Sequence, residues 1–216
     1  MALHRWFLAL VLPLALALLL ALSLALFTQP SHAQGVQTLR GFLSQHPALS
    51  GDFVQTTQGK AGQQSGSFSL AKPGMFRWAL KKPFEQLIVS DGKTLTQWDA
   101  DLNQATQRSA AGLLANTPVA LLLGGADADK FFVLKDLPKE AQDDPSIHWV
   151  QATPKNSDSQ FKVIKLAFKD GLPAQMVIQD AFGGVSLLAF KNVSTAAVPP
   201  AQFGFTLPKG ADMVRL

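Results

Sequence analysis

The side chains that most often perform catalysis are scarce in this sequence. After the first 33 residues, the 216-residue chain has two histidines, His46 and His148, two glutamates, Glu85 and Glu140, and no cysteine or tyrosine. It has no Gly-x-Ser-x-Gly nucleophile motif, phosphate-binding glycine loop or His-x-x-x-His metal pair. Several aspartates, such as Asp91 and Asp170 before glycine and Asp144 before proline, stand where turn formation explains them. We therefore predict a protein that is not an enzyme and that has no metal site and no cofactor.

The N-terminus has the layout of a secretory signal peptide. A positively charged start, Met1–Arg5, precedes a mostly apolar run, and Ser31 and Ala33 are small residues at the positions expected before a cleavage site. We predict a signal peptide over residues 1–33 and one domain over residues 34–216. Because the apolar run has roughly the ~20 residues of a membrane span, an uncleaved anchor is the alternative. The lack of cysteine in an exported protein favours the bacterial periplasm.

The charge of the predicted mature chain is modest and scattered. It has 18 Lys and Arg residues (19 less Arg5) and 15 Asp and Glu residues, and no block of like charges. Nucleic acid is therefore not an expected partner.

The spacing of apolar residues predicts a mainly β domain with a few helices. Residues 36–46 show helical spacing, whereas from Gly51 onward the alternation has a period of two. Residues 109–125 interrupt the strands with an apolar run that lacks alternation, and Pro118 suits a helix start there. Two short helices are expected in this insertion.

Strong turn signals divide the strand-like segments into consecutive hairpins. They are Asp91-Gly92, residues 169–171 and residues 182–184. About nine to eleven antiparallel strands in sequence favour an open (incomplete) antiparallel β-barrel lidded by the short α-helices. A two-sheet sandwich is the alternative.

The stretch KPGMFRWALKKP, residues 72–83, has two chemically different faces if it is extended. Phe76, Trp78 and Leu80 lie on one side, whereas Arg77 and Lys81 lie on the other. Other strands, such as VSLLAFKNV, are apolar on both faces. Two interpretations follow: ordinary burial on both sides of a sheet, or an apolar interior that accepts a hydrocarbon chain.

Five short motifs follow one another along the chain: FVQT (53–56), KPGMFRW (72–78), VSDGKTL (89–95), DLNQAT (101–106) and NTPVALLL (116–123). Together they resemble the periplasmic outer-membrane lipoprotein carrier proteins, the LolA family. Their order and spacing match from about Gly51 through Leu123, and FTLPKGADMV (205–214) agrees more loosely. The resemblance implies a monomeric periplasmic carrier. It would take acylated lipoproteins from an inner-membrane ATP-driven exporter to an outer-membrane acceptor.

The resemblance also implies a hydrophobic ligand cavity beneath a helical lid. The expected cavity residues are Leu39, Phe42, Phe53, Phe76, Trp78, Leu80, Leu121, Leu122, Met176 and Phe190. Lys72 stands where the family typically has an arginine, which latches the lid by hydrogen-bonding to helix carbonyls, and Arg77 is a second candidate for this latch. Thr96 is expected on the cavity wall, where bulkier aromatic residues are familiar.

Two other classes of function remain open from the sequence. The first is a periplasmic lipid-binding or envelope-stress-sensing module on the same fold, anchored by an uncleaved leader. The second is a hydrolase of lipid or peptidoglycan.

Overall fold

The computed structural model describes residues 34–111, 117–123, 128–138 and 144–216. Residues from Ala33 to Leu216 form one compact unit. The predicted signal peptide and part of the predicted helical insertion, residues 112–116 and 124–125, lie outside the described ranges. Among the described residues, no helix is both long and apolar enough to cross a membrane.

One long helix precedes a series of short strands, with two further short helices in the middle of the chain. The helices are α2 (Gly35–Gln45), α3 (Pro118–Leu123), α4 (Ala128–Phe131) and the 3-10 helix η2 (Pro200–Phe203). The first six strands are β1 (Ala48–Thr57), β2 (Gln64–Ala71), β3 (Met75–Lys82), β4 (Gln86–Asp91), β5 (Thr94–Asp99) and β6 (Gln104–Ser109). The others are β7 (Phe132–Asp136), β8 (Ile147–Pro154), β9 (Phe161–Lys169), β10 (Leu172–Asp180), β11 (Val185–Ser194) and β12 (Asp212–Arg215).

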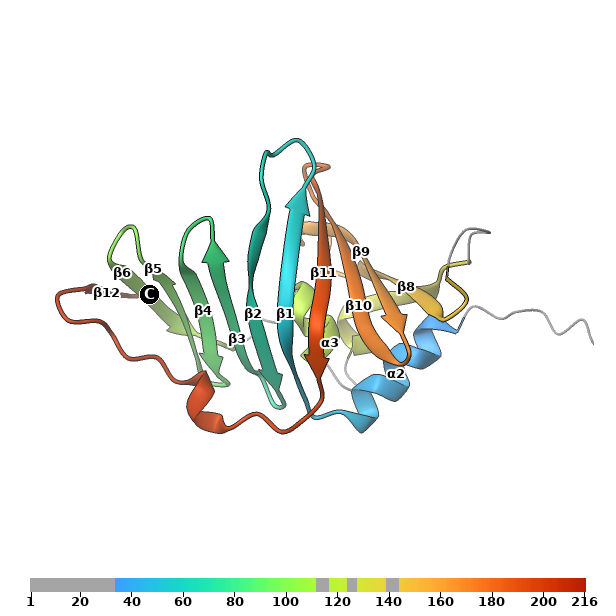
Figure 1. The fold of residues 1–216 in the computed structure, drawn as a ribbon, viewed down its shortest axis with the longest axis horizontal. Coiled ribbons are helices and arrows are strands. Elements are labelled where there is room, and N and C mark those ends of the chain that lie inside the picture. Colours follow the sequence, from blue (N-terminus) through green and yellow to red (C-terminus); the bar gives the residue numbers. More distant parts are fainter. Residues whose placement is uncertain (1–33, 112–116, 124–127, 139–143) are drawn as a thin grey trace, which may run out of the picture. The chain divides into compact units, whose positions relative to one another are not determined.

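The described strands form a single 12-stranded sheet in the order β12-β6-β5-β4-β3-β2-β1-β11-β10-β9-β8-β7 (Figure 1). Neighbouring strands are antiparallel, except that β12 runs parallel to β6. Because β12 and β7 lie at opposite ends of this order, the sheet is open. The prediction of an open, mainly antiparallel β architecture with helices is confirmed, although the strand count exceeds the nine to eleven expected.

The predicted turns connect the strands as expected. Asp91 ends β4, and its Oδ1 accepts hydrogen bonds from the backbone N–H groups of Lys93 (2.8 Å) and Thr94 (2.7 Å). These bonds favour the carboxylate and hold the pKa of Asp91 below its usual value. Helix α3 begins at Pro118, which the sequence also predicts.

One face of the sheet carries the main core, and we call it the inner face. Leu39 and Phe42 of α2, Leu121 of α3 and Phe168 of β9 belong to one buried cluster on this side. The Phe42 and Phe168 rings are 5.6 Å apart. Both helices therefore cover the inner face.

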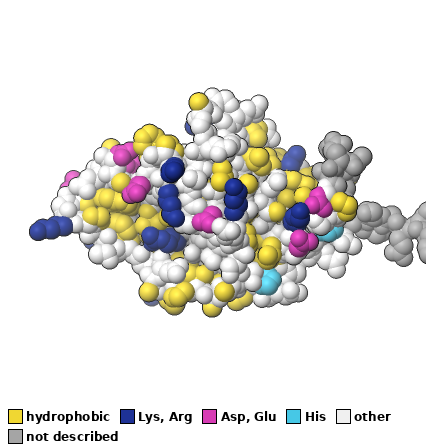
Figure 2. Space-filling model, viewed as in Figure 1, with side chains coloured by type: hydrophobic (Ala, Val, Ile, Leu, Met, Phe, Trp, Pro, Cys, Tyr) yellow, Lys and Arg dark blue, Asp and Glu magenta, His cyan; other side chains and the backbone are white. Residues whose placement is uncertain are grey.

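The opposite, outer face is partly covered by the C-terminal segment. Phe203 of η2 is buried against Ala48 and Ala71, and the Trp98 ring lies 6.1 Å from the ring of Phe205. Seen from this side, Lys and Arg side chains stand in several separate groups among apolar and uncharged ones (Figure 2).

Candidate functional site

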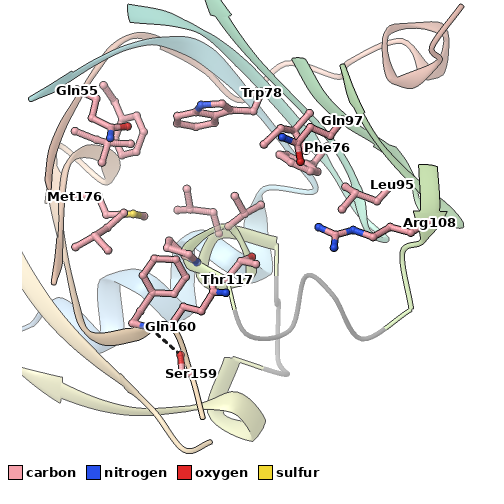
Figure 3. A pocket seen from close by; sticks show the side chains of 18 of the residues that line it. Gln55, Phe76, Trp78, Leu95, Gln97, Arg108, Thr117, Ser159, Gln160 and Met176 are labelled. Carbon is pink, nitrogen blue, oxygen red and sulfur yellow. Dashed lines mark hydrogen bonds between the residues drawn. The ribbon is translucent and has the colours of Figure 1, made fainter. Parts of the chain in front are cut away.

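A cavity of about 560 Å³ lies between the inner face of the sheet and α3. This volume falls within the range of roughly 300–1,000 Å³ that is usual for ligand sites. Phe76 and Trp78 of β3 line one side, and Met176 of β10 lines the other, as the close view shows (Figure 3). Pro118, Val119 and Leu122 of α3 also line this cavity.

The strand register places the aromatic residues of β2 and β3 on the same wall. Phe68 is paired with Trp78, and Leu70 with Phe76. The Trp78 ring also stacks on Phe53 of β1, with centroids 3.9 Å apart and an interplanar angle of 23°. Gly66 leaves room for the Phe53 ring, because an added Cβ would lie 2.8 Å from that ring and 2.0 Å from the carbonyl oxygen of Ala79.

The structure divides the expected cavity residues into two groups. The residues that line the cavity are Phe76, Trp78, Leu122, Met176 and Phe190. The residues that pack in the adjoining core, with Leu80 only partly buried against it, are Leu39, Phe42, Phe53, Leu80 and Leu121. All ten belong to one continuous apolar cluster, but only the first group borders empty space.

Other lining residues were not named from the sequence. The apolar ones include Ile88, Leu95, Ile178 and Leu188, and they could have been found by continuing the two-residue alternation along β4, β5, β10 and β11. Polar lining residues include Gln55, Gln97, Arg108 and Asp158. Their side chains gave no signal in the sequence that separates them from ordinary surface residues.

Thr96 does not border the cavity, contrary to expectation. It is paired with Val89 and Gln107 on the outer face, and its Oγ1 accepts a hydrogen bond from the Gln107 amide at 3.4 Å. Its neighbours Leu95 and Gln97 line the cavity instead. In a strand, an error of one position moves a side chain to the opposite face.

Lys72 joins the end of β2 to the last turn of α2. Its Nζ donates a hydrogen bond to the carbonyl oxygen of Leu43, one of the helix-end carbonyls that lack a partner within the helix. Partial burial lowers the pKa of the Lys72 ammonium below its usual value. Arg77, the second residue considered for this role, lies on the outer face, where its Nη1 donates to the carbonyl oxygen of Gln202 at 3.5 Å.

Helix α2 has two further attachments. The backbone N–H of Val36 donates to Asp136 Oδ1 at 2.7 Å, and Arg40 forms an exposed ion pair with Asp129 at 3.1 Å. Helix α2 is thus held near both of its ends and in the middle.

The described residues contain no group of three or more His, Cys, Asp or Glu side chains that could hold a metal ion. The geometry is that of a mostly apolar pocket in an open β-sheet with a helical cover.

Comparison with known proteins agrees with that class. The family model described as "Outer membrane lipoprotein carrier protein LolA" matches residues 44–206. An outer-membrane lipoprotein carrier protein of Bordetella avium is 39% identical over 190 residues, which is 85% of this chain and 89% of the relative. One of Methylibium petroleiphilum is 41% identical over 189 residues, which is 85% and 91% of the two chains. The chain therefore belongs to the LolA family of outer-membrane lipoprotein carrier proteins.

The fold has also been seen in solved structures. The crystal structure of an uncharacterized conserved protein from Thermus thermophilus is similar, with a TM-score of 0.56 and 14% sequence identity. The match covers 85% of this chain and 98% of the other. At this identity the likeness concerns the fold alone.

Proposed function

We propose that the protein is a periplasmic carrier that binds the acyl chains of lipoproteins in the inner-face cavity. It takes them from an inner-membrane ATP-driven exporter to an outer-membrane acceptor. Family membership supports this proposal, as do the two relatives that are named outer-membrane lipoprotein carrier proteins. In this proposal residues 1–33 direct export and are removed, and the protein performs no chemical step on its cargo.

The observation that carries the proposal is the apolar cavity beside a well-packed core. If a methylene takes up roughly the ~30 Å³ share of a water molecule, a cavity of about 560 Å³ holds roughly 19 methylenes. That is about one acyl chain. Helix α3 is the element that covers this space.

The energetics of acyl binding favour a carrier that depends on its partners. Burying a chain gains about 0.8 kcal/mol per methylene relative to water. A bilayer interior gives nearly the same gain, so transfer from membrane to cavity is close to neutral. Loading then needs an external source of energy, and unloading needs an acceptor that binds the chains slightly better.

The test places a charge in the cavity. Phe76→Glu is expected to abolish loading, because a carboxylate among acyl chains loses its hydration without gaining a partner. Ala79→Glu is the matched control, since it adds the same charge on the outer face of the same strand. Intact-mass analysis of lipoprotein that co-purifies with the exported protein is the measurement.

A second variant guards against a simple folding defect. Phe76 is only 4% exposed, so its replacement also perturbs the core. Ile88→Glu changes a partly buried cavity residue of β4, and its thermal unfolding should stay close to that of the parent protein. Normal loading of a folded Ile88→Glu variant together with normal loading of Phe76→Glu would show that lipoproteins do not use this cavity.

A further inference from the structure

The inner face changes from apolar to polar where it reaches β5 and β6. On β3 the inward side chains are Phe76 and Trp78, which are both apolar. On β6 the inward side chain is Arg108, which is paired with Leu95 of β5. The next inward pair is Gln97 and Thr106. Hydrogen-bonding groups therefore gather at this edge of the cavity, while Gln55, Asp158, Ser159 and Gln160 supply others elsewhere on its lining.

A second, smaller pocket adjoins the cavity at this polar side. It has a volume of about 160 Å³ and shares two lining residues, Gln97 and Arg108, with the large cavity. Its other lining residues are Asp99, Leu102, Gln104 and Thr106. A large apolar space and a small polar one, joined at Arg108, match the shape of an amphiphile.

Arg108 has no ion-pair or hydrogen-bond partner within the described part of the chain, and its guanidinium points into the cavity (Figure 3). The neighbouring carboxylate, Asp99, is already engaged. Its Oδ1 accepts the backbone N–H groups of Asp101 (3.1 Å) and Leu102 (3.2 Å), and its Oδ2 accepts the Gln86 amide at 3.2 Å. Arg108 is exposed, so its guanidinium donors are open to water and to a ligand at the border of the apolar space, with no acceptor among the described residues.

We propose that Arg108, with Gln97 beside it, binds the oxygen-rich head group of the lipid whose acyl chain occupies the cavity. The group bound is an acceptor, either the ester or amide carbonyls of a lipidated terminus or the phosphate of a phospholipid. A guanidinium suits both, because its planar fork can donate two parallel hydrogen bonds to a phosphate, or a charge-assisted hydrogen bond to a carbonyl oxygen. The inference rests on the proposed acyl binding and adds an orientation: the head lies at β5–β6 and the chain extends toward Met176.

The experiment compares three ligands that have the same hydrocarbon chain. Palmitoyl lysophosphatidylglycerol has a phosphate and an ester, monopalmitoylglycerol has the ester alone, and hexadecane has neither. Each displaces a fluorescent fatty acyl probe from the exported protein and from the Arg108→Gln variant. The matched control is Arg215→Gln, the same substitution on the adjacent strand β12 at an exposed position whose register partner, Gln107, faces outward.

Arg108→Gln is expected to lower the affinity for an oxygen-bearing ligand about tenfold, since a hydrogen bond from a charged donor is lost. A loss confined to the phosphate ligand assigns the site to phosphate, and an equal loss for both oxygen-bearing ligands assigns it to the carbonyls. Arg108→Lys should keep part of the affinity for the phosphate ligand, and Arg215→Gln should change none. Equal affinities of Arg108→Gln and the parent for all three ligands would overturn the inference, as would an equal loss for hexadecane.

Failure of the underlying proposal would look different. If the parent protein binds none of the three ligands, acyl binding itself is refuted. If it binds all three and Arg108→Gln does the same, only the head-group site is refuted.

Discussion

Helices α2 and α3 cover the same face of the sheet, but α2 packs in the core whereas α3 lines the cavity. Helix α2 has 11 residues, lies against β7, β8 and β9, and buries Leu39 and Phe42 in the core. Helix α3 has six residues and turns Val119 and Leu122 toward the cavity. The first helix fills the space it covers, whereas the second leaves space beneath it.

This difference shows that an apolar side chain on the inner face does not by itself mark a binding site. Leu121 is fully buried in the core, whereas its neighbour Leu122 borders the cavity. An inward side chain borders the cavity only where the side chains opposite it do not pack against it. We therefore expect substitutions in α2 to change stability and substitutions in α3 to change ligand binding.

The largest effect is expected from Phe42→Ala in α2. Phe42 is 4% exposed and packs against Phe168, so its truncation should lower the free energy of unfolding by about 3–5 kcal/mol. The affinity of the folded molecules for an acyl probe should stay the same, because Phe42 does not line the cavity. Urea denaturation gives the first quantity and probe titration the second. A stable variant with lost binding would reverse the comparison of the two helices.

Val119→Glu in α3 should have the opposite profile. Val119 is only partly buried and lines the cavity, so the carboxylate should reduce acyl affinity at least tenfold while stability falls far less than in Phe42→Ala. Val119→Thr is the control, because it has nearly the same shape without the charge and should bind almost normally. Equal binding by the glutamate and threonine variants would mean that α3 does not cover the bound chain.

A smaller effect is expected at the attachment of α2. Lys72→Ala removes the hydrogen bond to the Leu43 carbonyl and should lower the free energy of unfolding by about 1 kcal/mol. Lys72→Arg should keep the contact, since the guanidinium also donates to carbonyls. If the alanine and arginine variants are equally destabilised, the hydrogen bond does not stabilise the helix.

The same lysine should give a pH dependence of defined sign. Burial lowers the pKa of Lys72 in the folded protein below 10.5, so the unfolded chain holds this proton more tightly. The stability of the parent protein should therefore rise, relative to that of Lys72→Arg, as the pH increases through the folded pKa toward 10.5. Denaturation of both proteins at matched pH values measures this difference, and a difference that falls with pH would contradict the assignment.

Local signals in the sequence were enough to predict much of the fold. The hairpin at Asp91-Gly92 and the turns at residues 169–171 and 182–184 connect strands as expected, because glycine at such positions adopts the positive φ that tight turns need. The alternation in β3 also placed Phe76 and Trp78 together on the inner face. These features depend on a few adjacent residues.

Features that depend on distant parts of the chain were not predictable. Strand β12 has four residues and pairs with β6 in parallel, and no local sequence pattern predicts that pairing. Phe53 and Leu121 were predicted to line the cavity. Both face inward, but neighbouring side chains fill the space beside them. Arg108 was missed because it is exposed, like most charged residues near a strand end, and only the fold shows that it also borders the cavity.

The most direct test of the central claim uses Trp78 as a reporter of what enters the cavity. In a Trp6→Phe, Trp98→Phe, Trp149→Phe background, Trp78 is the only indole. We predict that fatty acids with a brominated chain quench its emission to saturation. The companion protein that keeps only Trp98, on the outer face, should not be quenched. Unchanged Trp78 emission in the presence of bound ligand, or equal quenching of both indoles, would contradict an acyl chain in the inner-face cavity.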